Sequence, residues 1–328
     1  MNPSKLFLRI VALVALTALA ACGAAPDVDS SEEENDETLT AELAVKGTPF
    51  GPAALPETEF GAPFTSTVLG MWAGADKEDL LDVLNLARAK GVGLALSLAP
   101  IGRQTFYIEN GCGAGKDCGF DLAKWKAWVA RWKGMNLKPY VDDGTLVVHY
   151  LLDEPYCAEC WDGKAVPFDA VDAAAKYSKE LFPYLPTAVR AAPTILKSKS
   201  NWQYLDTAWA AYLASHGDID KYIATQVSTA KQLGLGLVFS LNVINGGVIQ
   251  DPCPVDLATK DGRCAMTASL LKTAVKKMLA NDYACAVSMW SRGASFNGDD
   301  YFNRTDIENA VSSLMPIAKA RPRPPCRR

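Results

Sequence analysis

The chain has 328 residues, of which 49% are hydrophobic and 21% are charged, and it carries a formal net charge of −4 with a pI of about 5.4. This length and composition allow most of the chain to bury a core, as one large α/β domain or two small ones. No stretch forms a basic stripe, which argues against nucleic acid as a partner.

The N-terminus has the features of an export signal. Two basic residues precede an apolar run from Ile10 to Ala21, which is too short for a comfortable membrane span. The run ends in the sequence LAACG at residues 19–23, which resembles the lipobox of bacterial lipoproteins. That resemblance implies removal of residues 1–21 as a signal peptide and acylation of Cys22, with an ordinary secretory signal as the alternative. We therefore expect an exported protein of the bacterial cell envelope, at the outer membrane or cell surface, that is anchored in the membrane by its N-terminal lipid.

Residues 22–45 have the composition of a disordered tether. Seven acidic side chains lie between positions 27 and 37, among serine, asparagine and threonine. Such a run repels itself and buries little apolar surface, so it does not fold alone. We predict an acidic spacer here, followed by one folded domain at residues 46–328.

The folded domain is predicted to alternate strands and helices. We expect strands at residues 66–72, 92–99, 145–152, 187–192, 205–212, 235–241 and 283–289. We expect helices at residues 77–90, 121–132, 168–185, 218–233, 265–279 and 303–320. This alternation favours a parallel sheet, and at this length it favours a (β/α)8-type TIM barrel over an open sheet.

The predicted barrel is irregular because only seven strands are assigned. The eighth falls either in residues 48–64 or in the loop at 101–120. No glycine-rich nucleotide-binding motif opens a helix, so no nucleotide is expected, and we expect no other cofactor and no metal.

Several conspicuous side chains are interpreted as core. Trp125, Trp128, Val129 and Trp132 share one helix face through their spacing of three and four residues. His149 lies inside the strand predicted at 145–152, between apolar neighbours, and is expected to be a core histidine.

The stretch from Thr145 to Trp161 carries the strongest functional signal. An almost unbroken apolar run predicts a strand buried on both faces, and it ends in Asp153-Glu154-Pro155. Pro155 cannot donate to a sheet ladder, so the strand must stop there. Two carboxylates thus follow a buried parallel strand, at the edge where α/β barrels hold their active sites. A turn cap made by Asp153, with Glu154 solvated, is the alternative.

Other strand ends add aromatic and polar groups to the same predicted mouth. The candidate substrate-binding residues are Trp72, Trp209, Tyr212, Asn242, Trp290 and Arg292. Aromatic rings can stack on the C–H faces of sugars, and carboxylate, amide and guanidinium groups can bind sugar hydroxyls. We therefore expect an oligosaccharide or polysaccharide as the partner, whereas the sequence suggests no protein partner.

The strand ending in Asp153-Glu154-Pro155, together with Trp290 at the end of the last strand, resembles TIM-barrel glycoside hydrolases of the retaining kind. The resemblance implies that Glu154 is a general acid/base and that Trp290 lies beneath the scissile sugar. Three features depart from the family. Asp153 replaces an asparagine, the Glu154 strand is third by our count where the family uses the fourth, and the penultimate strand ends in Asn242 where the family has a nucleophilic glutamate.

The missing glutamate leaves the second catalytic carboxylate open. Retaining and inverting glycosidases both use two carboxyl groups. We take Asp153 as the partner or orienting carboxylate of Glu154, with Asp76, Asp206, Asp299 and Asp300 as alternatives. An inverting enzyme, a substrate-assisted enzyme, and a catalytically silent barrel that only binds glycan all fit this sequence.

Eight cysteines remain once Cys22 is assigned to lipid, and export favours disulfides. Proximity suggests the pairs Cys112–Cys118, Cys157–Cys160, Cys253–Cys264 and Cys285–Cys326, the first three of which would staple loops. The Cys157-x-x-Cys160 spacing also occurs in redox and zinc motifs, but we expect a closed disulfide.

Overall fold

The computed structural model describes residues 45–61, 63–100, 119–161, 163–247, 253, 264–290, 292–293, 295–296 and 299–328. The chain divides into two compact units, Met1–Thr38 and Leu39–Arg328, and the described residues all belong to the second. The predicted signal peptide, the acylation site at Cys22, nearly all of the acidic tether and the Cys112–Cys118 pair lie outside the described residues.

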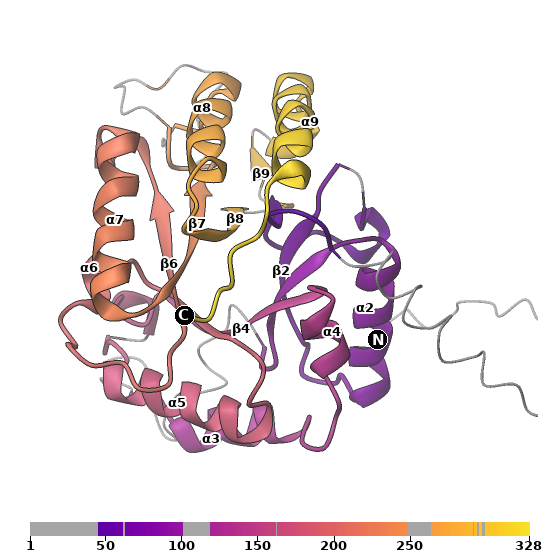
Figure 1. Ribbon diagram of the computed structural model, residues 1–328, viewed down its shortest axis with the longest axis vertical. Helices are drawn as coiled ribbons and strands as arrows, with labels where there is room; N and C mark the ends of the chain where they lie inside the picture. Colours follow the sequence, from indigo (N-terminus) through magenta and orange to yellow (C-terminus); the bar gives the residue numbers. More distant parts are fainter. Residues whose placement is uncertain are drawn as a thin grey trace, which may run out of the picture. The chain divides into compact units, whose positions relative to one another are not determined.

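Eight parallel strands form a nearly closed barrel, which confirms the predicted fold class (Figure 1). The strands are β1 (Phe50–Pro52), β2 (Ser66–Gly70), β3 (Gly93–Ser97), β4 (Leu146–Asp153), β5 (Thr187–Arg190), β6 (Thr207–Tyr212), β7 (Gly236–Asn242) and β8 (Ala284–Trp290). Each strand pairs with the next from β2 to β8, and β8 pairs with β1. A single bridge between Ala53 and Val68 links β1 to β2.

The first strand supplies the element that the sequence left unassigned. It lies within residues 48–64, one of the two expected places, and it is only three residues long. With β1 counted, the strand that ends beside Glu154 becomes the fourth of the barrel. The departure in strand number from the glycoside hydrolase pattern therefore disappears.

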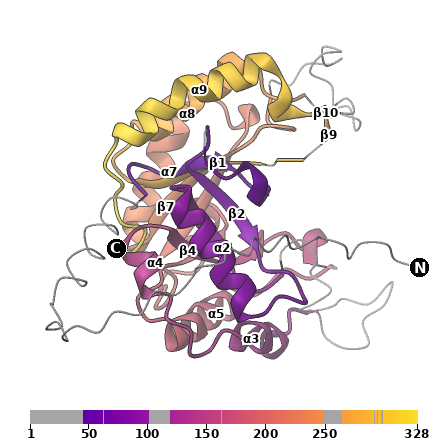
Figure 2. The ribbon, with the colours of Figure 1, turned by 90° about the vertical axis from the view of Figure 1, so that its right-hand side faces the viewer.

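Helices cover the outside of the barrel, with α8 and α9 on one side and α3 and α5 on the other in Figure 2. They are α2 (Lys77–Ala89), α3 (Leu122–Ala130), α4 (Lys138–Asp142), α5 (Phe168–Leu181), α6 (Pro193–Leu196), α7 (Ile219–Leu233), α8 (Ala268–Leu279) and α9 (Thr305–Ala320). The other described elements are four short 3-10 turns and one small hairpin. The turns are η1 (Glu57–Glu59), η3 (Glu159–Trp161), η4 (Ala214–His216) and η5 (Tyr301–Asn303). The hairpin consists of β9 (Ser295–Phe296) and β10 (Asp299–Asp300).

Side-chain caps fix where several helices begin. The carboxylates of Asp76, Asp121 and Asp218 accept hydrogen bonds from backbone N–H groups in the first turns of α2, α3 and α7. These bonds satisfy donors that have no partner within the helix. The helix predicted at 168–185 ends earlier, at Leu181, because Phe182 leaves the helical conformation.

The residues interpreted as core are buried, except that Trp128 is only partly buried and packs against the core. Trp125 and Trp132 are fully enclosed, and their indole N–H groups donate to the carbonyls of Leu151 and Leu98 at 3.3 and 2.6 Å. His149 is also buried, with Nδ1 2.7 Å from Ser178 Oγ. Burial lowers the pKa of His149 to about 3, so the ring is neutral at physiological pH.

The C-terminal tail closes the base of the barrel, where the strands begin. Cys326 forms a disulfide with Cys285 of β8, and its carbonyl accepts a hydrogen bond of 2.6 Å from Thr207 at the start of β6. A Cβ atom on Gly236 would lie 2.0 Å from the same carbonyl oxygen, so only glycine allows this approach. In Figure 1 the C-terminus lies within the ring of elements.

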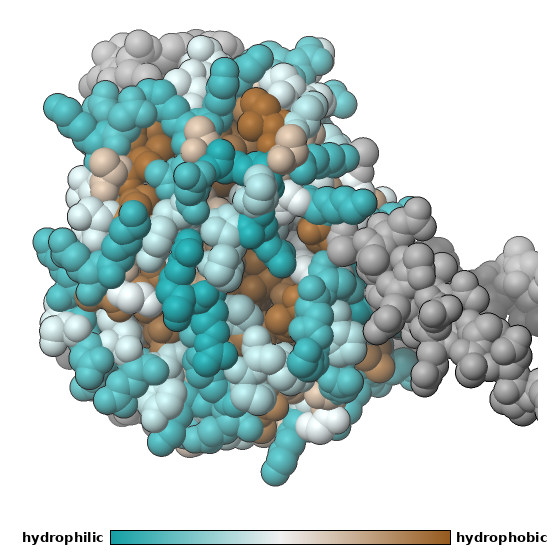
Figure 3. All heavy atoms as spheres, in the orientation of Figure 1, coloured by the Kyte–Doolittle hydropathy of each residue, from teal (hydrophilic) through white to brown (hydrophobic). Residues whose placement is uncertain are grey.

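The structure also contains the expected disulfides Cys157–Cys160 and Cys253–Cys264. Hydrophilic residues predominate on the face shown in Figure 3, with hydrophobic ones scattered between them. Within the described residues, no helix combines the length and the apolar character that a membrane crossing requires.

Candidate functional site

A cavity of about 580 Å³ opens at the end of the barrel where β4 to β7 finish. The strands and the residues directly after them contribute Glu154, Arg190, Ala191, Trp209, Ala211 and Asn242 to its lining. The outer wall comes from the loops after β4, β5 and β6 and from α6 and α7, through Tyr156, Ala192, Thr194, Ile195, Leu213, His216, Lys221, Tyr222, Thr225 and Gln226. Pockets that bind small ligands commonly have such a volume and such a mixture of aromatic and polar groups.

Glu154 has an unusual backbone conformation, with a φ of +41°. Glutamate rarely adopts this left-handed region, because its Cβ crowds the following carbonyl at a cost of roughly 1–2 kcal/mol. The turn after β4 holds the residue there. Its carbonyl accepts hydrogen bonds from the backbone N–H of Cys157 at 2.9 Å and from the indole of Trp161 at 3.2 Å. Strain of this kind clusters at functional sites.

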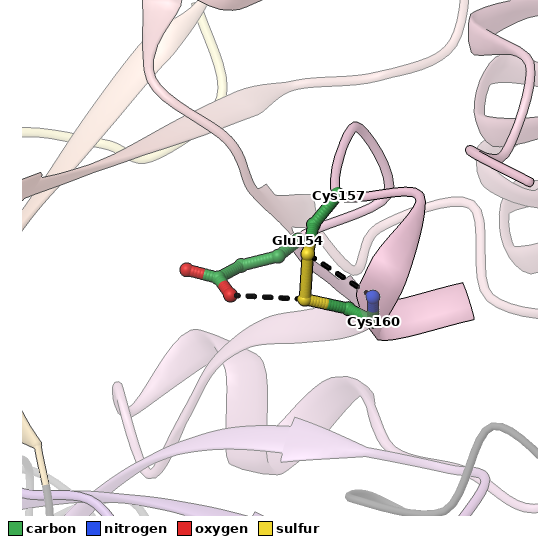
Figure 4. Close-up of side chains that lie close together, drawn as sticks. All are labelled: Glu154, Cys157 and Cys160. Carbon is green, nitrogen blue, oxygen red and sulfur yellow. Dashed lines mark hydrogen bonds between the residues drawn. A yellow bond between two sulfur atoms is a disulfide. The ribbon is translucent and has the colours of Figure 1, made fainter. Parts of the chain in front are cut away.

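The carboxylate of Glu154 has three close neighbours. Arg190 Nη2 lies 3.7 Å from Oε1, and the Tyr156 hydroxyl donates a long hydrogen bond of 3.4 Å to the same oxygen. Cys160 Sγ lies 3.8 Å from Oε2 (Figure 4). This last approach is a contact and not a hydrogen bond, because the sulfur is bonded to Cys157 and carries no proton. The Glu154 side chain remains 32% exposed, so a ligand can reach it.

Tyr156 stays protonated beside this carboxylate. Burial, and next the charge of Glu154, raise the pKa of its hydroxyl to about 12. At neutral pH the hydroxyl is therefore a hydrogen-bond donor toward Glu154.

The carboxylate of Asp153 makes different hydrogen bonds from that of Glu154. Its Oδ1 atom accepts hydrogen bonds from the Tyr150 hydroxyl at 2.8 Å and from Arg190 Nη1 at 3.0 Å. Burial alone would lower the pKa of Arg190, but the interactions with Asp153, Tyr150 and Glu154 together outweigh burial and raise it, so the guanidinium is firmly charged. Asp153 does not line the cavity, and its carboxylate and that of Glu154 both lie near the guanidinium of Arg190.

Arg190 also joins the site to Trp290 at the end of β8. Its guanidinium carbon lies 4.9 Å from the centre of the indole ring, in a cation–π arrangement. The indole remains 39% exposed. Trp290 therefore lies beside Arg190, although it does not line the cavity.

Two other predicted binding residues belong to the same region. Trp209 lines the cavity from β6, and its buried indole N–H has no acceptor among the described residues. Asn242 ends β7 and lines the cavity, while its Oδ1 accepts a hydrogen bond from the backbone N–H of Asn245.

Tyr212, Arg292 and Trp72 were expected at the same mouth, but none of them lines this cavity. Tyr212 is buried behind it, because its hydroxyl donates to the carbonyl of Gly217 at 2.7 Å. Arg292 is drawn away by Glu59, at 2.8 Å, and lines a separate cavity of about 370 Å³. Trp72 is 47% exposed in the loop after β2.

Three of the four alternative second carboxylates, Asp76, Asp206 and Asp300, do not join Glu154 either. Asp76 caps α2, and Asp206 lies at the base of the barrel, paired with Lys179 at 2.7 Å. Asp300 accepts from the backbone of η5 and lies 3.3 Å from Arg292. The side chain of Asp299 lies outside the description. Glu154 is therefore the single carboxylate that the described residues place around the cavity.

Helix α7 contributes a wall of the cavity that the sequence did not predict. Lys221, Tyr222, Thr225 and Gln226 face the cavity from this helix. Gln226 is buried and exchanges hydrogen bonds of 3.3 Å with the Thr194 hydroxyl of α6. Polar residues recurring every three or four positions on an inward helix face are the signal that would have identified this wall.

Metal binding has one geometric candidate in the described part of the chain. Ligand atoms of Glu154, Cys157 and Cys160 lie within 4.8 Å of one another. A disulfide, however, offers no thiolate, which is the form of cysteine that binds metals. In its oxidised form this group therefore provides a single carboxylate and does not fit a metal ion.

The fold and the site together define a (β/α)8 barrel with a strained glutamate at the end of its fourth strand.

No family model matches the chain, and no curated protein matches it in sequence. Solved structures do match. A GH2 β-galacturonidase from Eisenbergiella tayi, bound to galacturonate, superposes with a TM-score of 0.51 at 10% identity, over 83% of this chain and 53% of that enzyme.

A GH113 β-1,4-mannanase superposes equally well, with a TM-score of 0.51 at 11% identity, over 83% of this chain and 99% of the mannanase. This chain thus spans about half the length of the galacturonidase and nearly all of the mannanase. At such low identity these likenesses show the fold alone: the chain has the TIM barrel of these glycoside hydrolases.

Proposed function

We propose that this protein is a glycoside hydrolase of the bacterial cell envelope, held to the membrane by an acylated Cys22 and acting on an oligosaccharide or polysaccharide. Glu154 is the general acid/base of the proposed reaction. The observation that carries the proposal is the position of Glu154, which is held in a left-handed conformation after the fourth strand, beside a cavity of about 580 Å³. The barrel shared with known glycoside hydrolases supports it.

The surroundings of Glu154 suit a group that exchanges a proton with substrate. The carboxylate is partly exposed, while Arg190 and Tyr156 constrain one of its oxygens. A protonated Glu154 would donate to the glycosidic oxygen as the bond to the sugar breaks. Asp153 fixes the guanidinium of Arg190 and so orients the acid indirectly.

A catalytically silent, glycan-binding barrel is the second candidate. One observation favours it. The described lining of the cavity holds a single carboxylate, and β7 ends in Asn242 where a nucleophilic glutamate would complete a retaining pair. In this alternative the same cavity binds sugar, and Glu154 accepts hydrogen bonds from its hydroxyls.

A hydrolysis assay separates the two candidates. The compact unit Leu39–Arg328 would be tested on a panel of aryl glycosides and polysaccharides, beside Glu154→Gln and the control Glu159→Gln, an exposed acid in the same turn. Loss of a general acid should lower kcat by about 10²-fold or more. Activity in the wild type and in Glu159→Gln, but not in Glu154→Gln, supports the hydrolase. Glycan binding without turnover in all three proteins supports the silent barrel.

The envelope location is tested separately on the full chain. Palmitate labelling in a bacterial host should acylate the wild type, and Cys22→Ser should abolish labelling and release the protein from the membrane fraction. Labelling that persists in Cys22→Ser would contradict the proposed anchor.

A further inference from the structure

The Cys157–Cys160 disulfide lies against the proposed catalytic group. In Figure 4 the carboxylate of Glu154 turns one oxygen toward the disulfide, and Cys160 Sγ lies 3.8 Å from that oxygen, Oε2. The backbone N–H of Cys160 also donates to Cys157 Sγ at 3.1 Å. The bond thus closes the turn that directly follows the strained residue.

The same turn holds the backbone of Glu154. The N–H of Cys157 donates to the Glu154 carbonyl at 2.9 Å, and the N–H of Cys160 donates to the Cys157 carbonyl at 3.0 Å. A glutamate with a φ of +41° keeps that conformation only where its surroundings over-determine it. The disulfide is one of these constraints, because it fixes the distance between the two ends of the turn.

The position of this disulfide also makes it open to reductants. Cys157 and Cys160 are both partly exposed, and they lie only three positions apart in the sequence. Cys285 and Cys326 are instead buried, and their disulfide spans 41 residues. A disulfide that closes a short loop constrains the unfolded chain less, so it adds less to the stability of the fold. Cleavage of Cys157–Cys160 should therefore leave the barrel folded.

We propose that the Cys157–Cys160 disulfide positions Glu154 and that its reduction switches the site off. The inference rests on the proposed function, since it assigns regulation to the same glutamate. A dithiol reductant supplies the two electrons and two protons. The S–S bond breaks, two cysteine thiols form, and the reductant becomes a cyclic disulfide. The freed Cys160 thiol then has a proton to donate toward Oε2 of Glu154, and the turn can relax from its left-handed conformation.

The first test measures which disulfide opens. The full-length protein, solubilised in detergent, would be titrated with a dithiol, and its free thiols would be alkylated and mapped by mass spectrometry. Cys157 and Cys160 should be modified at a lower reductant concentration than Cys285 and Cys326. Equal or reversed sensitivity would overturn the switch.

The second test removes the bond. The double variant C157S/C160S would be compared with C253S/C264S, which lacks a disulfide distant from Glu154 in the sequence. Hydrogen exchange should be faster by at least about tenfold at the backbone amides of residues 157–166, in C157S/C160S only. The midpoint of thermal unfolding should fall by only a few degrees, because this disulfide closes a short loop. Unchanged exchange in this turn would overturn the positioning role.

The third test uses a substrate found in the hydrolysis panel. A shift of about 1 Å in a catalytic group can cost roughly 10²-fold in rate, so kcat should fall between about 10- and 100-fold in C157S/C160S, and in the wild type after dithiol treatment. KM should change little, because the α6 and α7 walls are untouched. Unchanged kcat in C157S/C160S would overturn the inference. If the wild type hydrolyses nothing, the proposed function fails, and the exchange and alkylation results alone decide the role of the disulfide.

Discussion

Arg190 Nη1 donates a hydrogen bond of 3.0 Å to Asp153, and the same guanidinium lies 3.7 Å from Glu154. Two neighbouring carboxylates at the end of β4 therefore share one cation, but with different geometry. Asp153 takes the direct hydrogen bond, while Glu154 keeps a freer carboxylate at the cavity. This division of roles is the basis of the first prediction.

Arg190→Met should destabilise the protein by about 2 kcal/mol, because the partly buried Asp153 loses its charged partner. The double variant D153N/R190M should recover part of that loss, because no charge is then left unpaired. Chemical denaturation of the wild type, both single variants and the double variant gives the coupling free energy between Asp153 and Arg190. Strictly additive effects would show that the pair is not coupled.

Relief of the strain at Glu154 should raise stability while activity is lost. Glu154→Gly removes a Cβ at a φ of +41° and should raise the unfolding free energy by about 1 kcal/mol, since glycine adopts this conformation readily. Ala54, with a φ of +58°, is the other described non-glycine residue in this region. Ala54→Gly should stabilise by a similar amount and leave hydrolysis intact. A destabilised Glu154→Gly beside a stabilised Ala54→Gly would mean that the contacts of Glu154 outweigh its strain.

Acid should destabilise the barrel partly through His149. The unfolded chain binds a proton on His149 below about pH 6.5, whereas the folded pKa is lowered to about 3. The free energy of unfolding therefore rises with pH across this window. On acidification from pH 7 to pH 5 it should fall by about 2 kcal/mol. His149→Gln, which can still bond Ser178, should flatten this dependence in denaturation experiments. His216→Gln, at a less buried histidine, should flatten it less, and equal effects would contradict the assignment to His149.

Gln226 should contribute to binding more than to folding. Gln226→Leu removes a polar group from the cavity wall, and the loss of one hydrogen bond to a sugar is worth about 1 kcal/mol, or roughly fivefold in Kd or KM. Gln232→Leu, on the exposed face of the same helix, is the matched control and should leave the affinity unchanged. Equal affinity of Gln226→Leu and the wild type for a bound glycan would remove α7 from the site.

The tail disulfide should stabilise the barrel more strongly than the one beside Glu154. In the chain-entropy account, a crosslink over 41 residues adds roughly 4 kcal/mol, about twice the value for one over three residues. C285S/C326S should therefore lower the unfolding free energy by several kcal/mol, whereas C157S/C160S should lower it by about 2 kcal/mol or less. The reverse order in denaturant titrations would contradict this account of the base of the barrel.

Local patterns were enough to predict most of the fold. The apolar run before Asp153 was long, rich in β-branched residues and stopped by a proline, so β4 was predicted to within one residue at each end. β1 was placed only within one of two candidate stretches, because it is three residues long and two of its residues, glycine and proline, are disfavoured in strands. It exists because β8 and the loop after it offer parallel partners, and those lie more than 230 residues away in the sequence.

Residues of the candidate site were predictable from the sequence only where they lie at the end of a strand or directly after it. Glu154 and Asn242 belong to that class, whereas Trp209 lines the cavity from within β6 and Trp290 lies beside Arg190 without lining it. Arg292 was placed wrongly because Glu59, whose position depends on the fold, draws its guanidinium to another cavity. The wall formed by α7 was missed because an inward-facing Gln226 resembles any other polar helix residue until its partner Thr194 is known.

The pairing of β1 with β8 joins opposite ends of the domain. A growing chain therefore cannot pair its first strand with β8 until that last strand has been made. Contacts of such long sequence separation slow folding, because much of the chain must be ordered before they form. Until then the early strands expose unpaired edges, so this barrel should depend on helper proteins that shield such edges while its synthesis and transport are completed.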